Sequence, residues 1–267
     1  MISMTKKSAM TLFQATSLVV CLGCGAPGSL DRTFTVDTVC GQGPLQEQTA
    51  KIVGGRECRS TNGTVVKILL FDEEDNQTIC SGVRLNRSTV LTAAHCLNEF
   101  VFSVLVELAS GEHLTPTKIT IHPAADNRGS LFINDAALLT IVPPAGEIPP
   151  PSVPMAESVE TGDTLSVLGY GVTDGTRPVG SGVLRIGEMR VSEVTTDSIF
   201  SDYLPPTMSN TCFGDSGGPA FIEDGAGRLV LAGITSTGAN VKCAVGDRSA
   251  FTNLTNQTLR EFIEQGM

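Results

Sequence analysis

The chain of 267 residues is long enough for one large domain or two small ones. Hydrophobic residues make up 41% of it and charged residues 17%, an ordinary globular composition that can form a sizeable core. A formal net charge of −10 repels phosphate backbones, so we expect no nucleic-acid partner.

The N-terminal segment has the pattern of an export signal. Two lysines precede an apolar stretch, about Ala9–Gly23, which is too short and too polar to span a membrane. Its end resembles a bacterial lipoprotein signal, in which a small residue precedes the lipid-modified cysteine, here Cys24, although Cys21 replaces the usual leucine. We predict a signal peptide over residues 1–24 and a product that is either released, as a secreted or periplasmic protein, or held at the cell surface through a lipid on Cys24.

The cysteine content agrees with export. Eight cysteines in a chain of this length indicate an oxidising compartment, and their spacing does not match a zinc site. Once the two cysteines of the signal are set aside, an even number remains for disulfide pairing. These are Cys40, Cys58, Cys80, Cys96, Cys212 and Cys243.

Composition divides the rest of the chain into two parts. Residues 25–51 are polar and weakly periodic and end at Lys51, which is typical of a propeptide. From Ile52 onward, short apolar runs alternate with turn residues, which predicts mostly β structure. The proline-rich segment 143–151 is read either as the connector between two β units or as a surface loop within one.

An amphipathic helix is expected at the C-terminus. Leu259, Phe262 and Ile263 are spaced by three and four residues within the segment 255–267. Thr255 or Asn253 would cap this helix, and its narrow apolar stripe would pack on the second β unit.

Three segments carry the residues of a hydrolase with a serine nucleophile. They are LTAAHC at 91–96, INDAALL at 133–139 and CFGDSGGP at 212–219. A serine hydroxyl is a weak nucleophile that needs a base with a pKa near neutrality, which histidine supplies, and a carboxylate that orients the histidine. Each segment alone is consistent with a structural turn or strand end, but together they predict a catalytic triad.

These segments resemble the trypsin and chymotrypsin family of serine proteases. The third matches the family's most distinctive motif from Gly214 to Pro219, and the sequence IVGG at 52–55 resembles the family's mature N-terminus. The resemblance covers residues 52–267. It implies an all-β fold of two packed six-stranded antiparallel β-barrels with a short C-terminal helix, and a serine endopeptidase of protein or peptide substrates that needs no cofactor or metal ion.

The resemblance also implies the roles of individual residues. His95 would be the general base, Asp135 would orient it, and Ser216 would attack the scissile carbonyl. The N–H groups of Gly214 and Ser216 would form the oxyanion hole.

Activation by cleavage follows from the same resemblance. Cleavage after Lys51 would free the amino group of Ile52, which would pair with the buried carboxylate of Asp215. The chain would then be a zymogen.

The disulfides and the substrate pocket are likewise assigned by resemblance. Cys80 would pair with Cys96 and Cys212 with Cys243, which leaves Cys40 to pair with Cys58 and tether the propeptide. The family's pocket floor falls at Asn210, where trypsin-like enzymes carry aspartate, so we expect an uncharged residue before the cut and a separate activating protease for Lys51. The other residues expected along the pocket are Thr211, Ser236, Thr237, Gly238 and Ser249.

Two alternatives are weighed against this interpretation. A non-catalytic binding homologue on the same fold would usually lack a triad member, whereas all three are present. An α/β-hydrolase also places its serine in a glycine-flanked motif, but its triad runs Ser, Asp, His along the chain, and the order here is His, Asp, Ser.

Overall fold

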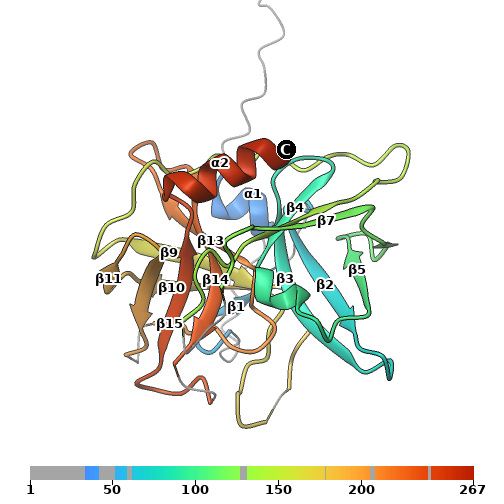
Figure 1. The fold of residues 1–267 in the computed structure, drawn as a ribbon. Helices are drawn as coiled ribbons and strands as arrows, with labels where there is room; N and C mark the ends of the chain where they lie inside the picture. The colour runs from blue at the N-terminus through green and yellow to red at the C-terminus, as the bar shows by residue number, and fades with distance from the viewer. Residues whose placement is uncertain are drawn as a thin grey trace, which may run out of the picture. The chain divides into compact units, whose positions relative to one another are not determined.

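The computed structural model of the protein describes residues 34–41, 52–58, 62–126, 131–177, 179–204, 208–239 and 242–267, which all belong to one compact unit. The predicted signal peptide with Cys24 and the predicted processing residue Lys51 lie outside the described residues. Two curled antiparallel sheets dominate the unit, with one short helix, α1, and one C-terminal helix, α2 (Figure 1). The predicted all-β class with a short C-terminal helix is confirmed.

The first sheet comes from the first half of the chain. Its strands are hydrogen-bonded in the order β6-β5-β2-β3-β4-β8-β7. They are β2 (Val65–Phe71), β3 (Gln77–Arg84), β4 (Thr89–Thr92), β5 (Ser103–Glu107), β6 (His113–Leu114), β7 (Lys118–Ile121) and β8 (Ala137–Thr140). A single turn of 3₁₀ helix, η1 (Ala94–Leu97), follows β4.

The second sheet comes mainly from the second half. Its order is β1-β10-β9-β13-β14-β15-β12-β11. The strands are β1 (Arg56–Glu57), β9 (Thr164–Gly169), β10 (Arg185–Arg190), β11 (Glu193–Val194), β12 (Ser198–Asp202), β13 (Pro219–Glu223), β14 (Leu229–Gly238) and β15 (Arg248–Asn253). The sheets therefore hold seven and eight strands where six each are expected, because β6, β1 and β11 are two-residue strands added at sheet edges.

The proline-rich segment 143–151 lies between β8 of the first sheet and β9 of the second. This agrees with its interpretation as a connector between two β units. Proline cannot donate to a sheet ladder, so the chain leaves one sheet here and enters the other.

Three hydrophobic clusters hold the unit together. One lies within the first sheet and includes Val66, Ile68 and Leu139, and a second lies within the second sheet and includes Leu165 and Phe251. The third contains residues of both sheets. Strand β2 shows how the clusters are divided: Val65 belongs to the shared cluster and Val66 to the cluster of the first sheet, because successive side chains of a strand point to opposite faces.

Part of the predicted propeptide belongs to this core. The helix α1 (Val36–Cys40) buries Val39 completely, and the Phe34 ring packs edge-on against Phe221 at 5.4 Å. The Leu229 N–H donates to the Phe34 carbonyl at 2.7 Å. Residues 34–41 are thus packed against the sheets, whereas the sequence predicts only a covalent tether.

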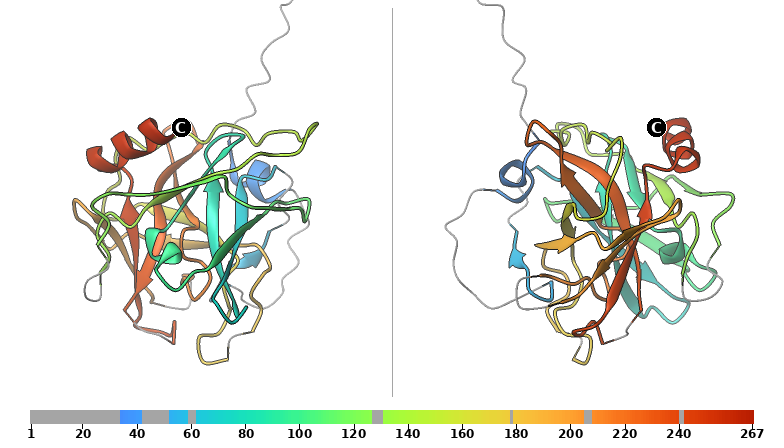
Figure 2. Two further views of the ribbon diagram at one scale, coloured as in Figure 1. Left: turned by 45° about the vertical axis from the view of Figure 1, so that its right-hand side comes forward. Right: turned by 90° about the vertical axis from the view of Figure 1, so that its left-hand side faces the viewer.

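The C-terminal helix is found as α2 (Gln257–Gly266), which lies outside the sheets (Figure 2). Leu259 and Ile263 are buried in the shared cluster. The cap is Asn256, whose side chain accepts a hydrogen bond from the Thr258 N–H, so the predicted caps at Thr255 and Asn253 are wrong. Asn253 instead closes the turn before the helix by accepting from Thr255. Among the described residues, no helix is long and apolar enough to cross a membrane.

Candidate active site

Strand register brings His95 and Asp135 together. β4 and β8 are antiparallel, and Thr92 at the end of β4 pairs with Ala137 at the start of β8. His95 follows β4 in η1, and Asp135 precedes β8, so the two residues meet at the same end of the ladder. The His95 Nδ1 lies 2.7 Å from the Asp135 Oδ2, and the His95 backbone N–H donates to the Oδ1 at 2.9 Å.

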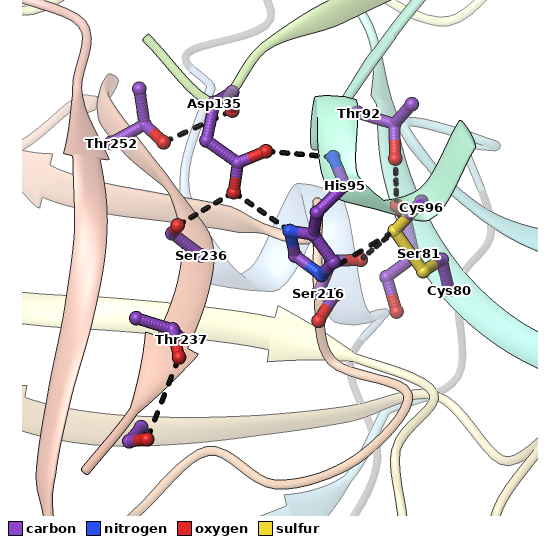
Figure 3. Close-up of polar contacts among 11 residues, drawn as sticks. Cys80, Ser81, Thr92, His95, Cys96, Asp135, Ser216, Ser236, Thr237 and Thr252 are labelled. Atoms are coloured by element: carbon purple, nitrogen blue, oxygen red, sulfur yellow. Dashed lines mark hydrogen bonds and ion pairs between the residues drawn. A yellow bond between two sulfur atoms is a disulfide. The ribbon is translucent and has the colours of Figure 1, made fainter. Parts of the chain in front are cut away.

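The Asp135 carboxylate has a further donor from the second sheet. Ser236 on β14 donates its hydroxyl to the Oδ2 at 2.6 Å, as Figure 3 shows. Burial raises the pKa of Asp135, but the hydrogen bonds and attraction from His95, together with Ser236, outweigh it and hold the pKa below its usual value. Asp135 is therefore a stable anion that fixes one tautomer and one orientation of the His95 ring.

Ser216 lies in the tight turn before β13. The Gly217 N–H donates to the Thr235 carbonyl on β14, and the Thr235 N–H donates back to the Gly218 carbonyl. Gly217 has a φ of 78°, and a Cβ there would lie 2.1 Å from the Thr92 hydroxyl oxygen. Only glycine fits this position, because the turn passes directly against β4.

The N–H groups proposed for the oxyanion hole belong to Gly214 and Ser216. Within the described part of the chain, neither donates to a protein acceptor. Ser81 on β3 fixes the loop from behind: its hydroxyl donates to the Gly214 carbonyl and its N–H donates to the Ser216 carbonyl, both at 2.8 Å. With the carbonyls turned toward Ser81, both N–H groups are left without a protein acceptor among the described residues, as an oxyanion hole would require.

His95 and Ser216 line the same cavity, of about 340 Å³. No hydrogen bond joins the His95 ring to the Ser216 hydroxyl in this uncleaved chain, although the two side chains lie next to each other in Figure 3. The Phe132 ring lies 4.9 Å from the His95 ring and lines the same cavity. A substrate carbonyl placed in this space would contact both groups.

Asp215 is buried directly behind the nucleophile. Its carboxylate accepts hydrogen bonds from the Gly171 N–H at 2.8 Å and the Cys212 N–H at 2.9 Å. Burial raises the pKa of Asp215 to about 6, because these two bonds and the distant Arg185 only partly offset the lost hydration. No ion pair to Asp215 is formed by the described residues.

Ile52, the predicted partner of Asp215, is also buried, with 2% of its surface exposed. The next residue, Val53, bonds through its carbonyl to the Asn210 N–H at 2.8 Å. The segment that begins at Ile52 is thus already seated beside the segment that leads from Asn210 to Ser216. No hydrogen bond joins Ile52 to Asp215 among the described residues, and in the intact chain Ile52 contributes an amide rather than a cation.

The pocket residues expected from the sequence form one hydrogen-bonded group. The Thr211 and Ser249 hydroxyl oxygens lie 2.7 Å apart, and Ser249 donates to the Asn210 Oδ1 at 2.8 Å. The Asn210 Nδ2 then donates to the Asp247 Oδ2 at 2.8 Å. Asp247 was not singled out from the sequence, and it lines the same cavity as Ser216.

Comparison with known proteins agrees with this geometry. The family model described as Trypsin matches residues 52–261. The chain belongs to the trypsin family. Bovine (Bos taurus) duodenase-1 is 28% identical over 82% of this chain and 93% of its own length, and mouse (Mus musculus) cathepsin G is 27% identical over 73% and 78%.

Solved structures show the same fold. HL collagenase superposes with a TM-score of 0.64, at 22% identity, over 80% of this chain and 97% of that protein. Membership of the trypsin family implies a hydrolase that acts on protein or peptide substrates.

This trypsin-family chain forms all three predicted disulfides: Cys80–Cys96, Cys212–Cys243 and Cys40–Cys58. The first holds η1, and with it His95, against β3. Cys80, His95 and Cys96 lie close enough together to resemble a metal site, but both sulfurs are consumed by the disulfide. Disulfides of this kind fit an extracellular protein.

Sequence reasoning missed Ser81, Phe132 and Asp247. Ser81 follows a disulfide cysteine, but nothing in the sequence shows that its hydroxyl would turn toward Gly214. Phe132 lies directly before the Asp135 segment, which is a signal that could have been used. Asp247 lies two residues before Ser249, and its direction depends on the loop after Cys243.

Proposed function

We propose that this protein is a serine endopeptidase that uses His95, Asp135 and Ser216. The observation that carries the proposal is the anionic Asp135, bonded at once to His95 and to Ser236, beside a cavity that holds both the histidine ring and Ser216. A non-catalytic homologue would not need a buried anion behind a partly exposed histidine.

The geometry supports a two-step acyl transfer. His95 takes the proton from the Ser216 hydroxyl as its oxygen attacks the scissile carbonyl, and the resulting imidazolium is stabilised by Asp135. The oxyanion is stabilised by the N–H groups of Gly214 and Ser216, and each such donor is worth about 3 kcal/mol of barrier lowering. His95 then protonates the leaving amine. His95 next takes a proton from water as the water oxygen attacks the acyl carbon, and it gives that proton to the Ser216 oxygen as the ester bond breaks and the carboxylic acid leaves.

We further propose that the chain is a zymogen activated by cleavage between Lys51 and Ile52. A carboxylate buried without a cation, such as Asp215, is costly, and a new amino group on the already buried Ile52 would supply the missing charge. Support comes from the raised pKa of Asp215 and from the packing of Ile52 and Val53 beside Asn210.

The product would then be a two-chain enzyme. Residues 34–41 are bound through Cys40–Cys58 and through the packing of Phe34 and Val39, so cleavage after Lys51 would not release them. We also propose that the protein is exported, which the signal-like N-terminus and the disulfides support. The exported protein is either released or attached to a lipid at Cys24. Mass spectrometry of the mature N-terminus would separate these two outcomes.

The decisive test is labelling with a fluorophosphonate, which reacts with activated serines. The precursor should label slowly, the chain cut after Lys51 by a lysine-specific protease should label at least about 100-fold faster, and Ser216→Ala should not label. Hydrolysis of a casein substrate should rise with labelling. A cut, folded chain that neither labels nor hydrolyses casein would establish the non-catalytic alternative, and equal labelling before and after the cut would refute the zymogen proposal.

A further inference from the structure

The residue directly before Asp135 has an unusual backbone. Asn134 has a φ of 50°, in the left-handed region that residues with a Cβ rarely adopt. We propose that Asn134 is a positioning residue, whose left-handed backbone aims the Asp135 carboxylate at His95. This role rests on the proposed endopeptidase function and adds to that site a residue that acts through Asp135.

The left-handed residue leads into a tight turn around Asp135. The Ala136 N–H donates to the Asn134 carbonyl at 2.8 Å, which closes a three-residue turn centred on Asp135. Strand β8 begins at Ala137, immediately after this turn. The turn therefore fixes the direction of the Asp135 side chain relative to the ladder that β8 forms with β4.

A closed ring of hydrogen bonds holds this turn against the segment that follows β7. The Asn134 Nδ2 donates to the Ala124 carbonyl at 3.1 Å, and the Ala124 N–H donates to the His122 Nδ1 at 3.2 Å. The His122 N–H then donates to the Ala136 carbonyl at 2.9 Å, which returns the ring to the residue after Asp135. Both neighbours of Asp135 are thus tied to the same short segment.

His122 is a rigid member of this ring. It is 3% exposed, and its side chain packs edge-on against the Phe262 ring of α2 at 4.9 Å. Because the His122 Nδ1 accepts a hydrogen bond from Ala124, the imidazole is neutral and carries its proton on Nε2. Burial lowers the pKa of His122, which favours this neutral form. The helix α2 thus supports the ring around Asp135.

The second sheet sets how accurately Asp135 must be placed. Thr252 on β15 donates to the Asp135 carbonyl at 3.1 Å, and Ser236 donates to the carboxylate, as Figure 3 shows. The carboxylate has to reach Ser236 of one sheet and His95 of the other at the same time. A rotation of the Asp135 backbone would lengthen one of these bonds, and the left-handed turn restrains that rotation.

Asparagine meets two requirements at position 134. It tolerates the left-handed conformation better than most residues with a Cβ, and its amide supplies the donor to the Ala124 carbonyl. Glycine would keep the conformation and lose the donor, whereas alanine would lose both. The two substitutions separate the contribution of the backbone from that of the hydrogen bond.

Kinetics of enzyme already cut after Lys51 test this role, with one peptide chosen from the products of casein hydrolysis. Asn134→Ala should lower kcat by about tenfold, because the left-handed conformation costs alanine a free energy of that order. Asn134→Gly should lower kcat by no more than about threefold, for the lost bond to Ala124 alone. KM should stay the same in both variants, since Asn134 does not line the cavity that contains Ser216.

A matched control introduces the same strain outside the site. Asp75, in the exposed turn between β2 and β3, has a φ of 62°. Asp75→Ala therefore also places alanine in the left-handed region, but it should leave kcat unchanged.

The bond between His95 and Asp135 can also be followed without activity. In the Ser216→Ala precursor, the His95 Nδ1 proton should give a far-downfield proton NMR resonance, because it lies in a 2.7 Å bond to the Asp135 carboxylate. Adding Asn134→Ala should move this resonance upfield or broaden it. Adding Asn134→Gly or Asp75→Ala should leave it in place.

Two results would overturn the role of Asn134 and leave the proposed endopeptidase intact. One is an unchanged kcat and resonance in Asn134→Ala, and the other is an equal loss in Asn134→Ala and Asn134→Gly. A cut wild-type enzyme that neither labels with fluorophosphonate nor hydrolyses casein would refute the proposed function instead, and the resonance of the precursor would still decide on Asn134.

Discussion

Asp135 and Asp215 are both buried aspartates within the same candidate active site, yet their hydrogen-bond partners differ in kind. Asp135 receives hydrogen bonds from a histidine ring, a serine hydroxyl and a backbone N–H, and its pKa is lowered. Asp215 receives two backbone N–H groups, and its pKa is raised to about 6. Burial acts on both, so the difference comes from their partners.

The comparison separates a carboxylate whose charge is already stabilised by its partners, Asp135, from one whose charge is not, Asp215. The ionised Asp135 can support a positively charged His95 in the intact chain. Asp215 has an environment that would favour a nearby cation, and cleavage at Ile52 would create one. The predictions below change each carboxylate, or a donor to it, from the largest expected effect to the smallest.

Asp135→Asn should have the largest effect. An amide donor facing His95 would favour the wrong tautomer of the ring, so kcat of the cut enzyme should fall by about 10⁴-fold at neutral pH. Glu107→Gln is a matched control, because Glu107 also bonds a histidine, His113, but outside the site, and kcat should not change. A decrease of less than tenfold in Asp135→Asn would contradict the role of Asp135.

Asp215→Asn should be the next most harmful change, but only after cleavage. Without the carboxylate, the new amino group of Ile52 would have no anionic partner, and kcat/KM should fall by at least about 100-fold. The slow fluorophosphonate labelling of the precursor should stay nearly the same as in the wild type. Full activity of the cut variant would show that activation does not depend on this ion pair.

The precursor should also show an unusual pH dependence from Asp215. Its pKa is about 6 in the folded chain against the usual 3.8, so between these values the folded chain binds more protons than the unfolded one. This group's contribution to the free energy of unfolding therefore falls by about 3 kcal/mol as pH rises from about 4 to 6, and is constant above that.

Urea unfolding of the Ser216→Ala precursor, compared with Ser216→Ala/Asp215→Asn across that range, measures the contribution. The difference between the two free energies of unfolding should change by about the stated amount. Parallel curves would mean that Asp215 has an ordinary pKa in the intact chain.

Ser236→Ala tests the smaller share of the stabilisation of Asp135. Loss of one donor to a carboxylate should lower kcat by about tenfold, because His95 still holds the anion. Ser201→Ala on β12 is the control: the Ser201 hydroxyl is also buried but has no hydrogen-bond partner among the described residues, so kcat should be unaffected. Equal effects of the two changes would assign the result to packing alone.

Much of the fold and the triad could be predicted because the signals are local. The glycine-rich segment around Ser216 constrains its own backbone, the proline-rich segment marks the change of sheet, and the stripe through Leu259 predicts α2. The predicted cap of α2 is wrong because Asn253, Thr255 and Asn256 all have side chains that can cap a helix. Only the folded structure shows that Asn253 accepts from the Thr255 N–H, which leaves Asn256 to accept from the Thr258 N–H in the first turn of α2.

The sequence by itself predicted the family, the candidate triad and the pairing of the cysteines, since each depends on residue types in a set order. Tertiary structure decided three further points: that residues 34–41 belong to the core, that Asp215 has no ion-pair partner among the described residues, and that Asp247 bonds to Asn210 beside the cavity. The physical reason is the same in each case. The stability of a charge and the burial of a ring depend on the groups that surround them, and those groups come from distant parts of the sequence. Asn210 and Asp247, for example, are 37 residues apart and form a hydrogen bond only in the folded chain.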